Sequence, residues 1–386
     1  MLLIWVYWIL LLHMKNILVT GATGFIGKNL VESLRFYDDI NVFLFCSKDD
    51  ISYLEEVLLR ADFVVHLAGV SRPKHPEEFY KVNVGLTKKI VDYLEKCNKK
   101  IPILLSSSTQ AVLDNLYGKS KRQAEDIIFR YGKKNNVPVY VYRFPNLFGK
   151  WSKPNYNSVV ATYCHNITHG IPMEIDSPNK LLNLAYVDDV ILSIIENLKC
   201  RGDKRGRFAR IEPQYAVKLK RIAEIIFMFR ENQKNLYVPD LSNPFIKKLY
   251  STYLSYSPIN DFKYPLNVQA DGRGAFAEFL KTTGGGQVSV NICKPGITKG
   301  NHWHHTKIER FLVVSGSGIV RFRNVGDNKI IEYRVSGNKL EVIDIPPGYI
   351  HTISNSGETD LITIIWANEV FNKEKTDTYF ELLEID

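Results

Sequence analysis

The chain has 386 residues, of which 45% are hydrophobic and 24% are charged. That length suggests two or three domains of about 150 residues, and the apolar content excludes a disordered or low-complexity chain. The formal net charge of +9 would suit an anionic partner, but no basic block with interleaved aromatic residues occurs. We therefore expect the lysines to be scattered over solvated faces and expect no nucleic-acid partner.

The N-terminus and the cysteines bear on localisation. The first 12 residues are an unbroken apolar run, with no basic n-region and no small-residue cleavage site. They are too few to cross a bilayer, which takes about 20 residues, so we expect no stable membrane insertion. We expect translation to start at Met14, with residues 1–13 not native or not structured; a membrane-surface anchor is the alternative. The five cysteines form no CxxC pair and predict free thiols in a cytoplasmic protein.

From Asn16 to about residue 256, apolar strands alternate with glycine turns and amphipathic helices. The expected strands are residues 17–20, 41–45, 62–69, 103–108 and 137–143. The expected helices are residues 28–37, 77–96, 118–133, 157–169, 188–198 and 219–230. This alternation predicts an α/β, doubly wound Rossmann-type parallel sheet. Residues 239–244 and the Tyr/Ser-rich residues 250–258 are expected to form a connector.

A glycine-rich turn joins the first strand to the first helix. Glycine lets the backbone turn sharply and approach a pyrophosphate, which then lies on the amides of the helix N-terminus. The GxxGxxG spacing alone would suit an ordinary tight turn, but its place directly after a strand predicts a dinucleotide site. The residues expected to contact the cofactor are Gly21, Thr23, Gly24, Phe25, Ile26 and Gly27.

The end of the second strand bears on the choice of cofactor. An acidic residue that reads the ribose hydroxyls of NAD is expected there, about 20 residues after the glycine turn. The strand ends instead at Cys46-Ser47-Lys48, although Asp49 and Asp50 follow closely. The hydroxyl of Ser47 and the ammonium of Lys48 suit a 2′-phosphate, so the sequence favours NADPH.

Tyr117 and Lys121 lie four residues apart, on one face of a helical turn. A nearby ammonium lowers the pKa of a phenol, which could then pass a proton to or from a carbinol oxygen while hydride moves to or from a nicotinamide. A serine hydroxyl at the end of the fourth strand could hydrogen-bond the same oxygen. We predict Ser108, Tyr117 and Lys121 as catalytic residues, and Ser107 and Thr109 remain alternatives to Ser108.

These features resemble the extended short-chain dehydrogenases/reductases, most of which act on nucleotide sugars. The resemblance also covers the Arg143–Gly149 stretch and Tyr186-Val187-Asp188-Asp189. One departure is the gap of only eight residues between Ser108 and Tyr117, which is shorter than usual and leaves the choice of serine open. The resemblance implies further cofactor contacts from Leu67, Ala68, Gly69 and Asn83.

After about residue 256 the chain changes to short strands separated by Gly, Asn or Pro turns. The expected strands are residues 276–281, 287–293, 309–314, 319–323, 330–335, 340–345 and 361–366. This pattern predicts an all-β barrel or sandwich.

Three histidines and one glutamate in this second half form a candidate metal site. His302 and His304 are two residues apart on an extended segment, so both side chains point to one face. Glu309 opens the next apolar run and can join that face, whereas His351 must arrive from another strand. Three imidazoles and a carboxylate suit a divalent metal, with Zn²⁺ favoured. The alternatives are histidines that only pack or bind a ligand, and a structural metal without chemistry.

The same residues resemble the two cupin motifs. The first motif is matched at every position from Gly296 to Gly316, and the second lacks only its leading glycine, where Leu340 stands. The resemblance implies a C-terminal cupin barrel, with domains at residues 14–256 and 257–386. Residues 271–278 also resemble the opening of the dTDP-4-keto-sugar 3,5-epimerases, which implies a nucleotide-sugar contact for Arg273; an exposed turn is the plainer alternative. The residues leave the cupin base open among Lys299, His305 and Tyr349.

A reductase of this type fused to a cupin resembles the capsular polysaccharide assembling family CapF over nearly all of residues 14–386. The resemblance implies C3-epimerisation in the cupin and then NADPH-dependent C4-keto reduction, which turns UDP-2-acetamido-2,6-dideoxy-4-hexulose into UDP-N-acetyl-L-talosamine on the way to UDP-N-acetyl-L-fucosamine for capsule or O-antigen. The pairing is chemically sensible, because a 4-keto group acidifies the C3 hydrogen and reduction then locks the stereocentre. The implied sugar contacts are Arg143, Asn146, Lys153 and Asn155.

Two alternatives remain. In the first, the chain is a single-activity nucleotide-sugar reductase or epimerase whose cupin is a metal-stabilised oligomerisation module. In the second, the cupin is a regulatory domain that senses sugar. The long helices and the barrel edges make a homodimer reasonable in each case.

Overall fold

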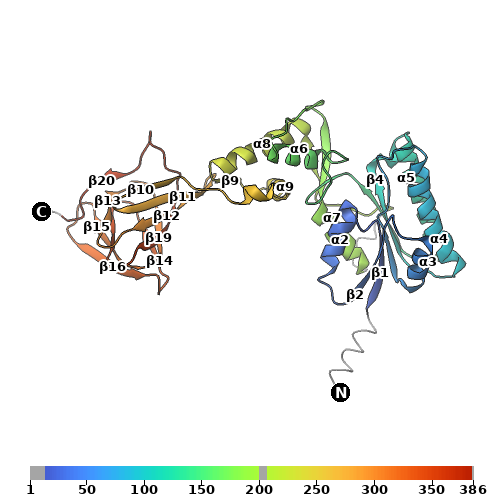
Figure 1. Cartoon of the computed structure of the whole chain (residues 1–386), viewed down its shortest axis with the longest axis horizontal. Helices are drawn as coiled ribbons and strands as arrows, with labels where there is room; N and C mark the ends of the chain where they lie inside the picture. The colour runs from blue at the N-terminus through green and yellow to red at the C-terminus, as the bar shows by residue number, and fades with distance from the viewer. Residues whose placement is uncertain (1–13, 200–206, 385–386) are drawn as a thin grey trace, which may run out of the picture. The chain divides into compact units, whose positions relative to one another are not determined.

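The computed structural model describes residues 14–199 and 207–384, so the expectation for residues 1–13 lies outside the described residues. The described chain divides into two compact units (Figure 1). The first holds residues up to Ile226 and Lys248–Ser257, and the second holds Phe227–Lys247 and residues from Pro258 onward. Helices α8 (Leu219–Lys234) and α9 (Pro244–Leu254) each have residues in both units, so a single domain boundary at residues 256/257 stays a prediction. None of the described helices is both long and apolar enough to cross a membrane.

A five-stranded parallel sheet forms the centre of the first unit, which confirms the predicted Rossmann-type fold. Its strand order is β2-β1-β3-β4-β5. The strands are β1 (Lys15–Thr20), β2 (Ile40–Phe45), β3 (Phe63–His66), β4 (Ile103–Ser108) and β5 (Val139–Phe144). Chain order reverses at β1, which has β2 on one side and β3 on the other. Ligands of such sheets bind outside the carboxyl ends of the strands at this reversal.

Helices cover both faces of this sheet. β1 shows why, because Ile17 and Val19 join one buried apolar cluster with α2 and α7, whereas Leu18 joins a second cluster with α3, α4 and α5. The helical elements are α2 (Phe25–Leu34), α3 (Ile51–Arg60), the π-helical segment η1 (Phe79–Leu86), α4 (Thr87–Lys96), the 3₁₀ turn η2 (Thr109–Val112), α5 (Leu116–Asn135), α6 (Val159–Thr168) and α7 (Val187–Leu198). A small second sheet contains β6 (Asn146–Phe148), β7 (Leu181–Tyr186) and β8 (Tyr215–Lys218).

The prediction of a connector at residues 250–258 was wrong, because α9 occupies most of that stretch. Asn243 caps the helix by accepting hydrogen bonds from the second and third amides after it, and Pro244 takes the first helical position. The Tyr/Ser-rich composition conceals a buried stripe at four-residue spacing, which consists of Phe245, Leu249 and Tyr253.

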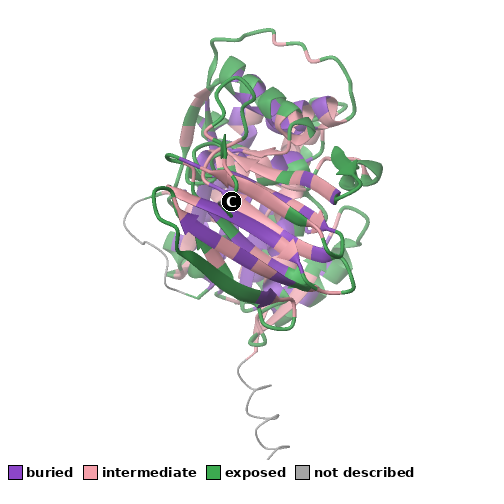
Figure 2. Cartoon of the chain, turned by 90° about the vertical axis from the view of Figure 1, so that its left-hand side faces the viewer, coloured by how far each residue is buried: buried purple, intermediate pink, exposed green. Residues whose placement is uncertain are grey.

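Two sheets, antiparallel except for the short parallel pair of β9 and β11, form the barrel of the second unit, which confirms the predicted all-β region. One sheet has the order β10-β11-β12-β19-β14-β17, with β9 beside β11, and the other has the order β16-β15-β18-β13-β20. Buried and less buried positions alternate along many strands, and strands of both sheets contribute to one apolar core (Figure 2). The elements are β9 (Tyr237–Val238), η3 (Ile259–Phe262), β10 (Val268–Asp271), β11 (Gly274–Thr282), β12 (Gly286–Cys293), β13 (Thr298–Trp303), β14 (Glu309–Ser315), β15 (Ser317–Asn324), β16 (Ile330–Ser336), β17 (Val342–Ile345), β18 (Tyr349–Asn355), β19 (Leu361–Ala367) and β20 (Tyr379–Phe380).

Candidate functional site

The three glycines of the GxxGxxG turn have separate structural reasons. Gly21 has a φ of +70°, and a Cβ there would lie 2.6 Å from the amide nitrogen of Ala68. A Cβ on Gly27 would lie 2.2 Å from the carbonyl oxygen of Gly21. Gly24 precedes α2 and offers no side-chain cap, so the first amides of α2 stay open to a ligand.

A cavity of about 590 Å³ in the first unit brings most of the predicted reductase residues together. The predicted cofactor and catalytic residues in its lining are Gly21, Thr23, Gly24, Phe25, Ile26, Gly27, Leu67, Gly69, Ser108, Tyr117 and Lys121. Asn146 and Lys153, which were predicted to contact the sugar, also line it. The glycine turn therefore shares one cavity with the Ser, Tyr and Lys side chains.

Lys121 and Tyr117 have different environments within that cavity. The Lys121 ammonium donates a 3.0 Å hydrogen bond to the Ser106 carbonyl, and burial lowers the pKa of Lys121 to about 8 while Glu125 opposes that shift. Burial raises the pKa of Tyr117, against a hydrogen bond from Ser108 that lowers it. The net pKa of Tyr117 is therefore raised and not lowered as the sequence predicts, because burial outweighs the contacts that favour the phenolate. A neutral phenol at neutral pH suits the donation of a proton to a ketone oxygen.

Two residues expected to read the cofactor phosphate lie at the carboxyl end of β2. Ser47 and Lys48 are exposed and lie outside the cavity lining. The Asp49 carboxylate accepts a 2.6 Å hydrogen bond from the Cys46 amide, so this acid caps the turn. The structure thus assigns Asp49 a structural partner and leaves Ser47 and Lys48 open to solvent.

Asn83 is buried in η1, where it hydrogen-bonds residues next to the cavity. Its side chain hydrogen-bonds the amide of Val70 at 2.8 Å, the carbonyl of Val70 at 3.0 Å and the hydroxyl of Ser120 at 3.0 Å. Its carboxamide oxygen also lies 3.1 Å from where a Cβ on Gly69 would lie. Asn83 therefore fixes the loop after β3 and does not line the cavity, and neither does Ala68.

Arg143, Asn155 and Arg273 were predicted to contact the sugar but lie elsewhere. The Arg143 guanidinium pairs with buried Glu125 and is not in the cavity lining. Asn155 has a φ of +55° and also lies outside the lining. Arg273, in the second unit, bonds the Asp271 carboxylate at 2.7 and 3.0 Å in an exposed turn, as the plainer alternative expected.

Two aromatic residues in the cavity lining, Trp151 and Tyr156, were missed by the sequence reasoning. Trp151 has a φ of +69°, which is uncommon for a bulky residue, and the Lys28 ammonium lies 4.5 Å from the centre of one of its rings. The signal available in the sequence was the pair of aromatic residues amid lysines in the stretch Lys150–Tyr156.

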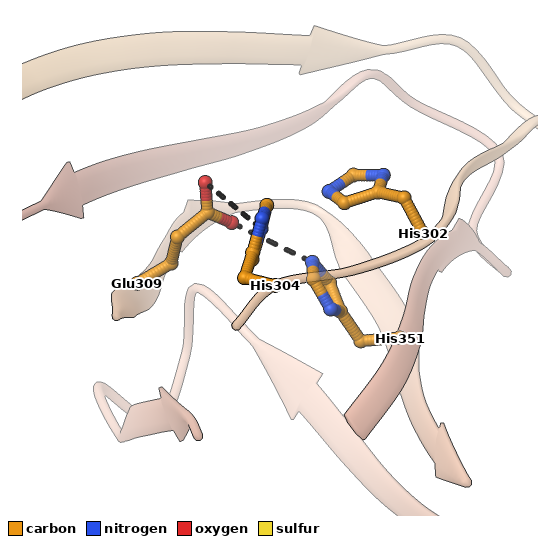
Figure 3. Close-up of side chains that lie close together, drawn as sticks. All are labelled: His302, His304, Glu309 and His351. Atoms are coloured by element: carbon orange, nitrogen blue, oxygen red, sulfur yellow. Dashed lines mark ion pairs between the residues drawn. The ribbon is translucent and has the colours of Figure 1, made fainter. Parts of the chain in front are cut away.

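In the second unit, all four predicted metal ligands converge inside the barrel (Figure 3). One candidate ligand atom from each of His302, His304, Glu309 and His351 lies within 4.8 Å of all the others. The Glu309 carboxylate faces two imidazoles, with Oε1 3.8 Å from Nε2 of His304 and Oε2 3.5 Å from Nε2 of His351. This is the arrangement of donors around a small cation.

A β-bulge aligns the histidines. β13 pairs with β18 so that Lys299 faces Ile353 and His302 faces His351, and the register shifts between Gly300 and His302. Because facing residues share one side of the sheet, the extra residue places His302 on the inner side together with Lys299. His304 lies just after the end of β13. Alternation along one strand therefore does not explain why His302 and His304 point to the same site.

The protonation chemistry of the cluster fits a divalent metal. Nε2 of His304 and Nε2 of His351 are buried without hydrogen-bond partners, while their Nδ1 atoms face the backbone carbonyls of Asp377 and Tyr349. Burial, with help from His351, lowers the pKa of His302 to about 4, so this imidazole is neutral. Burial alone would raise the pKa of Glu309, but His304, His351 and Lys307 hold it well below its ordinary value. A neutral His302 imidazole and an ionised Glu309 carboxylate are the states in which these two residues can bind a metal.

Comparisons with known proteins agree with this two-part architecture. Residues 17–199 match the model of the NAD dependent epimerase/dehydratase family, and residues 269–379 match the polysaccharide biosynthesis C-terminal domain. The crystal structure of capsular polysaccharide assembling protein CapF from Staphylococcus aureus is 48% identical, with a TM-score of 0.90, and the match covers 95% of this chain and 100% of that one. The chain belongs to the CapF family.

Two further relatives extend this membership. A UDP-2-acetamido-2,6-beta-L-arabino-hexul-4-ose reductase from Pseudomonas aeruginosa is 41% identical over 364 residues, covering 94% of this chain and 98% of the relative. A crystal structure of CapF with the inhibitor 3-isopropenyl-tropolone is 46% identical, with a TM-score of 0.85 over 95% of this chain and 100% of that chain. The similarity to CapF thus extends across both units.

Proposed function

We propose that the chain is a bifunctional nucleotide-sugar enzyme of capsule or polysaccharide synthesis. Its first unit would reduce the C4 ketone of a UDP-linked 2-acetamido-2,6-dideoxy-4-hexulose to give UDP-N-acetyl-L-talosamine. The observation that carries the proposal is the single cavity that holds the glycine turn together with Ser108, Tyr117 and Lys121. The P. aeruginosa relative, named as a reductase of such a sugar, supports the substrate class.

The cavity residues would divide the reduction between them. The bound nicotinamide cofactor supplies the hydride that reaches C4. The Tyr117 phenol gives its proton to the C4 oxygen, and Ser108, which already hydrogen-bonds that phenol, orients it. Lys121 stays anchored on the Ser106 carbonyl, where its charge would favour the phenolate left after proton transfer. Asn146 and Lys153 are the proposed sugar contacts, because both line the cavity.

NADPH is the proposed reductant, since Ser47 and Lys48 are exposed at the carboxyl end of β2. Replacing Lys48 with alanine should raise the KM for NADPH several-fold and leave the KM for NADH nearly unchanged. Equal effects on the two cofactors would contradict a 2′-phosphate contact.

The barrel would epimerise C3 before the reduction. A divalent metal held by His302, His304, Glu309 and His351 would supply Lewis-acid stabilisation of the negative charge that develops on the 4-keto oxygen. The ionised state of Glu309 and the open Nε2 atoms of His304 and His351 support this assignment. Zn²⁺ is the proposed ion, given the donor set.

The test separates the two steps. Wild-type enzyme, the UDP-4-keto sugar and NADPH should give the talosamine product, identified by NMR. The Tyr117→Phe variant in deuterated water should block reduction yet still place deuterium at C3. Failure to incorporate deuterium at C3 would refute an independent epimerase in the barrel. A homodimer is part of the same proposal, and sedimentation tests it.

The second candidate function is a reductase whose metal only stabilises the barrel. It is favoured by the deep burial of His304 and His351, each 1% exposed, because structural zinc sites are closed to substrate. Metal removal distinguishes the two candidates.

A further inference from the structure

The segment of residues 377–383, here called the C-terminal strap, lies along the strand that carries His302. Within it, β20 pairs antiparallel with β13, so that Phe380 faces His302 and Tyr379 faces Trp303. The ladder continues beyond β20, because the amides of Glu381 and Leu383 donate to the backbone and side-chain oxygens of Asn301 at 3.0 and 3.1 Å. The strap is thus bonded to the bulge that turns His302 inward.

Asp377, at the start of the strap, organises the loop between two candidate ligands. Its carboxylate accepts hydrogen bonds from the amides of His305, Thr306 and Lys307 at 2.9, 2.7 and 2.9 Å, and from the Thr306 hydroxyl at 2.9 Å. This loop leads from His304 to Glu309. One carboxylate therefore fixes the spacing of both ligands through four bonds.

The backbone carbonyl of Asp377 contacts the ring of His304 itself. It hydrogen-bonds Nδ1 of His304, and this contact assigns the ring proton to Nδ1. The lone pair of Nε2, which faces Glu309, is then free for a cation. The Asp377 carboxylate does not touch the His304 ring. It holds the Asp377 carbonyl in place through its hydrogen bonds to the loop of residues 305–307.

The strap is anchored from a third side by a buried arginine. Arg323 on β15 is 4% exposed and donates to the carbonyls of Leu382 and Leu383 at 3.0 and 2.8 Å and to the Glu381 carboxylate at 3.0 Å. The ring of Tyr379 stacks on Trp303 with centres 5.0 Å apart. Terminal segments usually fray unless tied down, and these contacts tie this one to the barrel.

We infer that the C-terminal strap is a positioning element of the metal centre, in which Asp377 presents Nε2 of His304 to the ion and metal binding and strap closure reinforce each other. The inference rests on the metal site of the proposed function. Outer contacts that orient metal-ligating histidines typically contribute 10- to 100-fold to metal affinity. By thermodynamic reciprocity, a strap that strengthens metal binding is itself stabilised by the metal.

The first experiment measures the Zn²⁺ dissociation constant of the full chain by competition with a chromophoric chelator. Asp377→Ala should weaken Zn²⁺ binding by about 10- to 100-fold. Asp377→Asn retains one acceptor oxygen, so its affinity for Zn²⁺ should lie between those of Asp377→Ala and the wild type. The matched control is Asp327→Ala, because Asp327 also caps backbone amides in a turn of the barrel but faces Asn328 and Lys329. Equal affinities for Asp377→Ala and Asp327→Ala would overturn the inference.

A second measurement needs no variant, so it holds even if Asp377→Ala does not fold. Zn²⁺ should slow hydrogen exchange at the amides of Glu381 and Leu383 in the wild type, relative to amides of β16. Stoichiometric Zn²⁺ binding without any such slowing would overturn the coupling while leaving the metal site intact. A wild type that binds no Zn²⁺ would instead overturn the metal site of the proposed function, and the strap's role with it.

Discussion

The guanidinium of Arg143 on β5 holds the carboxylate of Glu125 on α5 through two hydrogen bonds, of 2.9 and 2.6 Å. The same carboxylate accepts a 2.5 Å hydrogen bond from Ser107. Glu125 is 1% exposed and lies one helical turn after Lys121. The pair therefore ties the helix that carries Tyr117 and Lys121 to the strand end that carries the serines.

Removing the arginine should be costly because it leaves a buried charge unpaired. Arg143→Met is expected to lower the free energy of unfolding by about 3–5 kcal/mol, and the double variant Arg143→Met/Glu125→Leu should recover most of that loss. Urea unfolding of the full chain measures both. The control is Lys134→Met, which breaks an exposed pair with Glu95 in the same unit and should cost less than about 1 kcal/mol. If Arg143→Met is no less stable than this control, the unpaired Glu125 carboxylate does not destabilise the fold as proposed.

His66 predicts acid sensitivity of the first unit. Its ring nitrogens face the hydroxyls of Thr20 and Thr87 at 2.7 and 2.9 Å, and burial, with a contribution from Lys121, lowers its pKa to about 3. The unfolded histidine has a pKa near 6.5, so the unfolded state binds the proton first as the pH falls. Stability should thus be lost between about pH 6.5 and 3, by up to about 1.4 kcal/mol per pH unit.

The matched variant for that test is His66→Gln, which stays neutral and can still reach both threonines. Urea unfolding at pH 7 and pH 5 should show a smaller pH effect in this variant than in the wild type. The same loss of stability in both proteins would place the acid sensitivity elsewhere.

The glycine turn allows backbone strain to be separated from steric clash. Gly21 and Gly170 have nearly the same φ, +70° and +69°, but only at Gly21 would a Cβ meet other atoms, whereas nothing lies within 4 Å of a Cβ at Gly170. Gly170→Ala should cost about 1–2 kcal/mol of stability, the penalty for the left-handed conformation. Gly21→Ala should cost more and should also weaken NADPH binding at least tenfold, measured by fluorescence titration. Equal stability losses would show that the loop after β3 moves aside.

Metal removal tests the role of the barrel. After chelation, the catalytic candidate predicts that C3 deuterium exchange disappears, that NADPH binding persists and that Zn²⁺ restores exchange. The structural candidate predicts a lower thermal stability with C3 exchange retained. NMR of the sugar and titration of NADPH on the same sample measure both outcomes.

Much of the reductase cavity could be predicted from the sequence because its residues are local. The steric reasons for Gly21 and Gly27 lie within a few residues of the turn or in the adjacent strand end, and Tyr117 and Lys121 share one helical turn. The bidentate pair of Arg143 was not predictable, because its partner Glu125 is a helix residue whose burial depends on how α5 packs. For the same reason, the sequence could not show that burial would govern the pKa of Tyr117.

In the barrel, the spacing of His302, His304, Glu309 and His351 predicted the cluster, since each residue type is a metal donor. Asp377 had no such signal, because it lies far along the chain from His304 and acts partly through its backbone. The four-residue spacing of Phe245, Leu249 and Tyr253 in α9 is present in the sequence. It was overlooked because the tyrosines and serines of this stretch are typical of a connector.

The bulge at Gly300 and Asn301 has a consequence for how such barrels diversify. Asn301 is the one extra residue that separates inward-facing Lys299 from inward-facing His302. Deleting that residue would restore strict alternation, because His302 would then stand two residues after Lys299 and would still face inward, opposite His351. Loss of a single codon would therefore spare all four metal donors but remove the Asn301 oxygens to which the amides of Glu381 and Leu383 are bonded. A family scan that checks only for the histidines would not notice this change.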